Sequence, residues 1–200
     1  MADIYRDFAH LAANEHEGDD FAILVRARDP QRLVFAPHGG GIERGSSELA
    51  VAIAGAEASL YVFEGRKRTG NWVLHVTSTR FDEPRLLGLL AQAEHALAVH
   101  GESSKRSAVF VGGGDELRAA ALRSALAAAG FTAESHAVFA GRDPANVCNR
   151  ARSGAGLQLE VSMGLRRELF EDVTLAGVRR PTPQFAAFVT AIRGSWLQTG

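Results

Sequence analysis

The chain has 200 residues, of which 46% are hydrophobic and 22% are charged, and its formal net charge is −1. This length and composition suit one domain with a substantial buried core, and the balanced charge argues against a generally basic nucleic-acid-binding protein. Cys148 is the only cysteine, which excludes an internal disulfide and a cysteine-based zinc cluster. A bound metal would therefore need histidine and carboxylate ligands.

The first twenty residues are charged throughout and lack the apolar core of a signal peptide. No segment approaches the roughly 18 apolar residues that a membrane-spanning helix needs. We therefore expect a cytoplasmic protein whose partners include neither nucleic acid nor a membrane; the oligomeric state stays open. We expect one domain over residues 1–200, in which residues 1–18 form an N-terminal helix and an acidic loop.

Apolar periodicity predicts strands alternating with helices along the chain. The expected strands are Phe21–Arg28, Arg32–Ala36, Leu60–Glu64, Asn71–Thr79, Ala96–Val99, Ala108–Val111, Phe131–Phe139 and Leu157–Ser162. The expected helices are Asp3–Ala13, Ser46 or Ser47 to Ala54, Glu83–Ala93, Asp115–Ala129, one containing Leu165 and Leu169, and Thr182–Leu197. This alternation predicts a single α/β domain with a mixed, mostly parallel central sheet and helices on both faces.

Histidines follow two of the predicted strands, each with glycine next to it. His38 and Glu43 lie in the stretch VFAPHGGGIERGSSELA, and His100 ends the stretch ALAVH before a glycine. Ligands of parallel sheets bind beyond the carboxyl ends of the strands, so these side chains are expected to meet there. Two histidines and one carboxylate form a ligand set of catalytic zinc that leaves a position open for water. The alternative is a glycine turn with surface His and Glu.

His75 competes with His100 for the place of the third ligand. It lies inside NWVLHVTST, where its neighbours Val73, Leu74 and Val76 look buried, so His100 is the preferred ligand. We expect His75 to be a core histidine or a partner that supports a ligand from behind, with ligation as the alternative. Asp82 is a candidate for orienting a ligating histidine.

Glu160 stands inside the apolar strand LQLEVS. A buried carboxylate is costly unless it is paired, hydrogen-bonded or close to a metal. Beside a zinc ion it could take a proton from water and pass it to the leaving amine, whereas the alternative is a strand-end Glu that faces solvent.

Four blocks of the sequence, in order, carry a resemblance to a known family. They are PHGGGIERGSSELA, LHVTSTRFDEP, ALAVHG and NVCNRARSGAGLQLEVS. Together they resemble the poly-γ-glutamate hydrolases of bacteriophage and bacterial origin, sometimes labelled phage-related replication proteins. The similarity extends from about Asp20 to the C-terminal helix. The resemblance implies a trimmed zinc carboxypeptidase fold with one catalytic zinc per chain.

The resemblance also implies roles for individual residues. His38, Glu43 and His100 correspond to the zinc ligands and Glu160 to the general base. Arg150 corresponds to an anion-binding residue that holds a substrate carboxylate or stabilises the oxyanion. Two further candidates for substrate binding are Asn149, in the same donor-rich block, and Arg80.

Two features depart from the related patterns. The spacing His-x4-Glu is longer than the His-x2-Glu of ordinary zinc carboxypeptidases, so their mechanism transfers better than their local geometry. Arg80 stands where the resemblance to the phage enzyme implies histidine, which would alter substrate preference.

The leading functional hypothesis is a zinc-dependent amidohydrolase that cleaves γ-glutamyl amide bonds in poly-γ-glutamate or a related anionic γ-linked peptide. A second hypothesis is a carboxypeptidase or deacylase acting on α-peptides or N-acyl amino acids. A third, from another class, is a non-catalytic protein that binds a polyanion on the same scaffold. Zinc content together with turnover of γ-linked and α-linked polyglutamate would distinguish the three.

Overall fold

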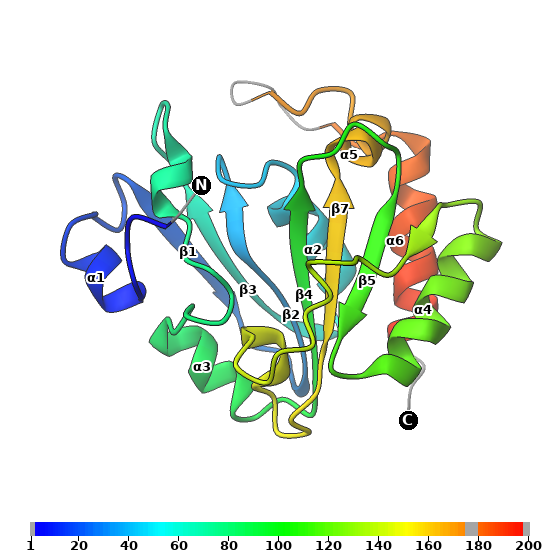
Figure 1. The fold of residues 1–200 in the computed structure, drawn as a ribbon, viewed down its shortest axis with the longest axis horizontal. Helices are drawn as coiled ribbons and strands as arrows, with labels where there is room; N and C mark the ends of the chain where they lie inside the picture. The colour runs from blue at the N-terminus through cyan, green and yellow to red at the C-terminus, as the bar shows by residue number, and fades with distance from the viewer. Residues whose placement is uncertain (1–2, 175–179, 198–200) are drawn as a thin grey trace.

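The computed structural model describes residues 3–174 and 180–197. Its centre is a seven-stranded mixed sheet of order β1-β3-β2-β4-β7-β5-β6 (Figure 1). The strands are β1 (Phe21–Arg26), β2 (Asp29–Gly40), β3 (Ala58–Gly65), β4 (His95–Glu102), β5 (Val109–Gly113), β6 (Ala133–Glu134) and β7 (Leu157–Ser162). Strands β3, β2, β4 and β7 run parallel to one another, whereas β1 and β5 are antiparallel to β3 and β7. The predicted mixed, mostly parallel sheet is confirmed.

Helices cover both faces of this sheet, as expected. They are α1 (Phe8–Ala12), α2 (Ser46–Ala54), α3 (Pro84–Leu90), α4 (Glu116–Ala128), α5 (Met163–Leu169), α6 (Pro183–Trp196) and the 3-10 turns η1 (Asn71–Leu74) and η2 (Val147–Asn149). One buried apolar cluster joins the sheet to α2, α4, α5 and α6, and a second joins its other face to α1 and α3.

Strand β2 shows why the central strands have continuous apolar runs. Val34 and Ala36 belong to the first apolar cluster, and their neighbours Leu33 and Phe35 belong to the second. Successive side chains of a strand point to opposite faces, so a strand covered on both sides needs apolar residues at every position.

Two of the expected strands are wrong in type or length. Asn71–Thr79 contains η1 and then a loop, and its apolar side chains Leu74 and Val76 are buried in the second cluster without strand pairing. Of Phe131–Phe139, only Ala133–Glu134 pairs with β5. In both segments packing buries the apolar side chains that the periodicity detected, so a hydrogen-bonded ladder is not required.

The topology places the carboxyl ends of β2, β4 and β7 side by side at the upper edge of the sheet in Figure 1. Residues from chain segments 72–79 and 138–146 line a pocket together with these strand ends. In the described part of the chain, no helix is long and apolar enough to cross a membrane.

Candidate metal and catalytic site

His38 lies near the end of β2, where the pairing of β2 with β3 shifts register between Ala36 and Gly39. The glycines that follow are required by close packing. A Cβ on Gly39 would lie 2.3 Å from the Ser47 Oγ and 2.8 Å from the Phe63 carbonyl oxygen. Gly40 has a φ of +62°, which L side chains rarely adopt. The chain can therefore leave the sheet immediately after His38.

Glu43 is brought back over the strand end by this glycine loop. Its backbone N–H donates to the His38 carbonyl at 2.9 Å, and its carboxylate accepts the Gly101 N–H at 2.9 Å. Burial alone would raise the pKa of the Glu43 carboxyl, but the rings of His38 and His100 beside it lower it well below its usual range. Glu43 is therefore a carboxylate inside the protein.

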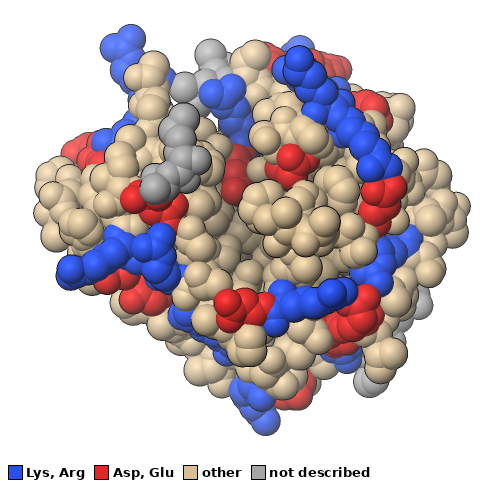
Figure 2. Space-filling model, viewed as in Figure 1, with Lys and Arg blue, Asp and Glu red and all other residues tan. Residues whose placement is uncertain are grey.

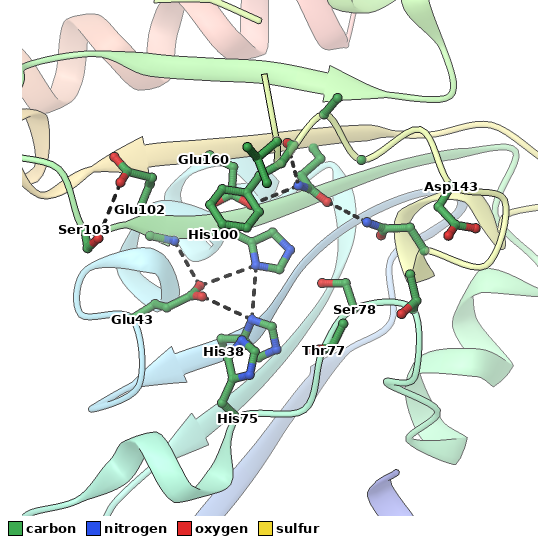
Figure 3. A pocket seen from close by; sticks show the side chains of 18 of the residues that line it. His38, Glu43, His75, Thr77, Ser78, His100, Glu102, Ser103, Asp143 and Glu160 are labelled. Carbon is green, nitrogen blue, oxygen red and sulfur yellow. Dashed lines mark hydrogen bonds and ion pairs between the residues drawn. The ribbon is translucent and has the colours of Figure 1, made fainter. Parts of the chain in front are cut away.

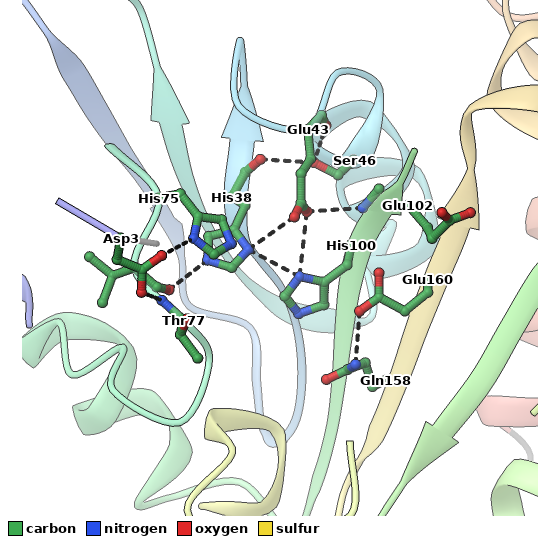
Figure 4. A network of polar contacts seen from close by, with 12 residues as sticks. Asp3, His38, Glu43, Ser46, His75, Thr77, His100, Glu102, Gln158 and Glu160 are labelled. Atoms are coloured by element: carbon green, nitrogen blue, oxygen red, sulfur yellow. Dashed lines mark hydrogen bonds and ion pairs between the residues drawn. The ribbon is translucent and has the colours of Figure 1, made fainter. Parts of the chain in front are cut away.

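His100 lies on β4 and completes a group of three metal-type donors (Figure 4). Its Nδ1 lies 3.1 Å from the His38 Nδ1 and 3.4 Å from one Glu43 oxygen; the other Glu43 oxygen lies 3.2 Å from the His38 Nδ1. The His38 Nε2 contacts the Val76 carbonyl oxygen at 2.8 Å, which places its proton there and leaves Nδ1 free to act as a ligand.

The separations of these donors fit a tetrahedral metal ion. Zinc bonds to nitrogen and oxygen of about 2.0–2.1 Å place tetrahedral ligand atoms about 3.3 Å apart. The three observed separations, 3.1, 3.2 and 3.4 Å, bracket that value. Both histidines are at most 2% exposed, so the protein holds two ring lone pairs and a carboxylate together with little access to water. Such an arrangement is stabilised by a cation at its centre.

His75 offers a second, overlapping donor set. His38, Glu43 and His75 have ligand-type atoms within 4.8 Å of one another. However, the His75 ring stacks on the His38 ring, with centroids 4.1 Å apart and an interplanar angle of 30°. The His38 Nδ1 and the His100 Nδ1 lie 3.1 Å apart, whereas the His75 Nδ1 is bonded to Asp3. The geometry therefore favours His100 as the third ligand and places His75 behind His38.

The partner of His75 comes from the N-terminal segment, which the sequence did not indicate. Asp3 accepts from the His75 Nδ1 at 2.7 Å and from the Thr77 N–H at 2.8 Å. The other face of the His75 ring stacks on Trp72, with centroids 4.4 Å apart. Burial, followed by the neighbouring His38, lowers the pKa of His75 to about 4, so the ring is neutral.

Glu160 lies on β7 directly beside His100, its register partner on β4 (Figure 4). Burial raises the pKa of the Glu160 carboxyl well above its usual range, and the charge of Glu43 raises it further. The Gln158 amide donates to Glu160 at 2.9 Å, and the Asn146 amide donates to the Gln158 oxygen at 3.0 Å. The sequence analysis did not predict this chain of two hydrogen bonds. It could have linked Gln158 to Glu160, because residues two apart on one strand share a face.

A buried arginine lies beneath the donor group. Arg166 is 2% exposed and donates to the carbonyls of Val161, Arg44 and Glu102 at 3.0, 2.5 and 2.7 Å. Arg166 therefore links two segments, the loop that contains Glu43 and the end of β4.

Arg150 has partners other than the expected substrate anion. Its guanidinium donates to the carbonyls of Ala145 and Thr79, each at 2.8 Å, and of Phe81 at 3.4 Å. Asn149 donates to the carbonyls of Gly141 at 2.8 Å and Asp143 at 2.9 Å. Both side chains hold loops in place, and neither lines the pocket.

Arg80 and Asp82 also have partners other than those the sequence suggested. The Arg80 guanidinium is half exposed and donates to Asp3 at 2.6 Å. Asp82 accepts the backbone N–H of Phe8 at 2.8 Å, so it fixes α1 rather than a histidine. Asp3 has the place beside a histidine that was expected for Asp82.

His38, Glu43, His75, His100 and Glu160 all line one pocket of about 640 Å³ (Figure 3). We call the side formed by His38, Glu43, His100 and Glu160 the donor wall. We call the side formed by residues 77–79 and 138–146 the loop wall. Both walls contribute side chains to the same cavity, so a substrate lying in it would contact the donor wall and the loop wall together.

Comparison with known proteins assigns the chain to a family. A sequence profile described as poly-gamma-glutamate hydrolase matches residues 5–191. The chain is 41% identical to the UPF0714 protein YndL of Bacillus subtilis (strain 168) over 84% of its length, and 42% identical to the SPbeta prophage-derived UPF0714 protein YoqZ of that strain over 88%. It spans about two thirds of these relatives, 67% and 65% respectively.

Solved structures agree with this assignment. A bacteriophage poly-gamma-glutamate hydrolase superposes with a TM-score of 0.93 at 34% identity, covering 97% of this chain and 96% of that one. A zinc-free form of YndL superposes with a TM-score of 0.92 at 36% identity, covering 99% of both chains. The resemblance read from the four sequence blocks is confirmed: this chain is a hydrolase that belongs to the poly-gamma-glutamate hydrolase family.

Proposed function

We propose that the chain is a zinc-dependent hydrolase that cleaves γ-glutamyl amide bonds in poly-γ-glutamate or a related γ-linked peptide. The observation that carries the zinc assignment is the convergence of the His38, His100 and Glu43 donor atoms to separations of 3.1–3.4 Å. The family supports the substrate class, and the existence of a zinc-free form of the relative YndL supports zinc as the metal.

The residues of the donor wall have different proposed roles. His38, Glu43 and His100 would hold the ion, which, when bound, polarises the scissile carbonyl and lowers the pKa of water. Val76 and Gly101 orient His38 and Glu43 through the backbone. The burial of these side chains keeps the site dry, which strengthens its electrostatic interactions.

Glu160 is the residue we assign to proton transfer. It lies beside His100, lines the pocket, and is oriented by Gln158. Its raised pKa suits a carboxyl that takes a proton from water and then gives it to the leaving amine, because both transfers need a pKa close to the working pH.

Metal analysis combined with digestion assays tests the proposal. Purified protein should contain about one zinc per chain, and a chelator should abolish the shortening of poly-γ-glutamate on a gel until zinc is restored. Activity that survives complete removal of metal would overturn the zinc assignment.

The same assay separates the alternative functions. Cleavage of α-linked polyglutamate or of N-acyl amino acids, with γ-linked polymer left intact, would instead indicate a carboxypeptidase or deacylase. Binding of the polymer without turnover of any substrate would indicate a non-catalytic polyanion-binding protein.

A further inference from the structure

The pocket has an unusual charge for a protein that acts on a polyanion. Its described lining residues include five acids, Asp3, Glu43, Glu102, Asp143 and Glu160, but one guanidinium or ammonium group, that of Arg142. Figure 2 shows this face hollowed near its centre, with acidic side chains in and beside the hollow and basic ones spread around it. Apart from the proposed zinc ion, Arg142 is therefore the cationic group among these lining residues that could meet a carboxylate of the polymer.

Arg142 lies on the loop wall, at a point where the backbone is held on both sides. The Asn149 amide donates to the carbonyls of Gly141 and Asp143, the residues that flank Arg142. Gly141, with a φ of +66°, packs against Gln158, so a side chain there would be strained. The Arg142 backbone is therefore fixed at the pocket while its long side chain extends from it.

The opposite part of the loop wall consists of three consecutive hydroxyl residues, Thr77, Ser78 and Thr79. Arg150 connects the two parts, because it donates to the carbonyls of both Thr79 and Ala145. The Val147 N–H also donates to the Ser78 carbonyl at 2.9 Å. The loop wall thus holds the three hydroxyl residues and the backbone of Arg142 in a fixed relation, across the cavity from the donor wall.

The partner that Arg142 has in the structure is easily exchanged. Arg142 pairs with Glu116 at 3.0 Å, with side chains that are 61% and 50% exposed. Exposed pairs of this kind contribute little to stability. Glu116 also pairs with Arg123 at 2.6 Å, so it keeps a partner when Arg142 turns away.

We propose that Arg142, together with the hydroxyls of residues 77–79, forms a subsite for the α-carboxylate of a γ-linked glutamyl residue. The proposal rests on the proposed function, since it names the group of that substrate which the loop wall recognises. In the γ-linked polymer this carboxylate is a free side group, whereas in an α-linked chain the α-carbonyl is part of the backbone. An α-linked chain also has a free carboxylate on each unit, but that group lies two methylene groups further from the Cα atom. A subsite built for the α-carboxylate would therefore favour the γ linkage. A guanidinium can bind a carboxylate through two parallel hydrogen bonds, which suits this role.

Binding of two matched oligomers tests the subsite without relying on turnover. One is a γ-linked glutamyl oligomer, and the other is the same oligomer with its α-carboxylates converted to primary amides. Calorimetry uses the zinc-loaded protein carrying Glu160→Gln, so that neither ligand is consumed. Adding Arg142→Gln should raise the Kd of the carboxylate oligomer by about 10- to 100-fold and change that of the amide oligomer by less than about two-fold.

Three further variants sharpen the result. Arg142→Lys should restore part of the affinity, because it keeps the charge but loses the planar fork. Glu116→Gln should leave binding unchanged or tighten it, because it removes the competing partner. Arg106→Gln is the matched control: Arg106 is 55% exposed, pairs with Glu134 and does not line the pocket, so it should have no effect.

The outcomes separate this inference from the proposed function. Equal loss of both oligomers in Arg142→Gln, no loss of either, or no binding by the parent protein would overturn the subsite. If the carboxylate oligomer alone is lost, but zinc-loaded protein with Glu160 intact does not shorten poly-γ-glutamate, the subsite stands and the proposed hydrolysis fails.

Discussion

Three of the four donor-wall residues lie on neighbouring strands of the sheet, whereas the loop wall consists of segments that are not paired as strands. His38, His100 and Glu160 occupy β2, β4 and β7, which are adjacent and parallel, so the sheet itself brings these side chains together. The loop wall is positioned instead by two side chains, Arg150 and Asn149, that donate to backbone carbonyls. The sheet therefore positions the donor wall, whereas side-chain hydrogen bonds to backbone carbonyls position the loop wall.

Substitutions in the two walls should therefore change different properties of the protein. Changes in the donor wall or beneath it should affect the metal and the chemical step. Changes in the loop wall should affect substrate affinity and leave the metal in place. Four experiments test this division, beginning with the largest expected effect.

Glu160→Gln should lower kcat by about 10²- to 10⁴-fold, because the amide cannot accept a proton from water. Zinc content should stay at the parent level, since the three proposed ligands are intact. Steady-state hydrolysis of poly-γ-glutamate and metal analysis on one preparation measure both effects. Glu102→Gln, a second pocket carboxylate, serves as the control and should cost less than ten-fold. Comparable losses in both variants would show that charge, rather than proton transfer, is what matters.

Arg166→Met should weaken zinc binding by about 10- to 100-fold, because the loop carrying Glu43 loses its connection to β4. It should also lower the free energy of unfolding by about 3 kcal/mol or more, since buried carbonyls lose their donor. Chelator competition and urea unfolding of the metal-free protein measure the two changes. Arg167→Met, on the same helix but exposed, should change the unfolding free energy by less than about 0.5 kcal/mol. Parent-level zinc affinity in Arg166→Met would contradict the assigned role.

Arg150→Gln should reduce kcat/KM by about ten-fold, because the two parts of the loop wall lose their connection and the substrate is held less accurately. Zinc affinity should stay within about two-fold of the parent value. Arg152→Gln is the control, since Arg152 lies two residues away with a side chain that is 60% exposed. Loss of zinc from Arg150→Gln would show that the two walls are not independent.

Cys148 provides a probe of the loop wall with the smallest expected effect. Burial raises the pKa of the Cys148 thiol to about 12, whereas the pKa of an unfolded cysteine is about 8.5. The proton is therefore kept by the folded state in this interval. The buried, protonated thiol therefore makes its full contribution to the free energy of unfolding below about pH 8.5. This contribution is lost as the pH rises towards 12.

Thiol labelling between pH 8 and 9 should consequently be far slower in the folded protein than in urea. Arg150→Gln should accelerate labelling of the folded protein, because Cys148 belongs to the segment that Arg150 holds. Rapid labelling of the folded parent protein would contradict the inferred burial and pKa.

The sequence predicted most of the sheet and the residues of the donor wall for one reason. Buried parallel strands have continuous apolar runs, and their polar residues stand out where the runs end. His38, His100 and Glu160 could therefore be placed at one edge of the sheet from the sequence alone. The glycines after His38 were likewise recognisable as a turn that returns Glu43 to the strand end.

The tertiary structure alone decided the surroundings of these residues. Asp3 lies 72 residues from His75 in sequence, and Arg166 lies 122 residues from the Arg44 carbonyl, so no local pattern could pair them. The role of Arg150 depended on where the carbonyls of Thr79 and Ala145 lie, and the family motif could not show this. Periodicity records which side chains are buried, but hydrogen-bond partners distant in the chain are fixed only when the segments pack.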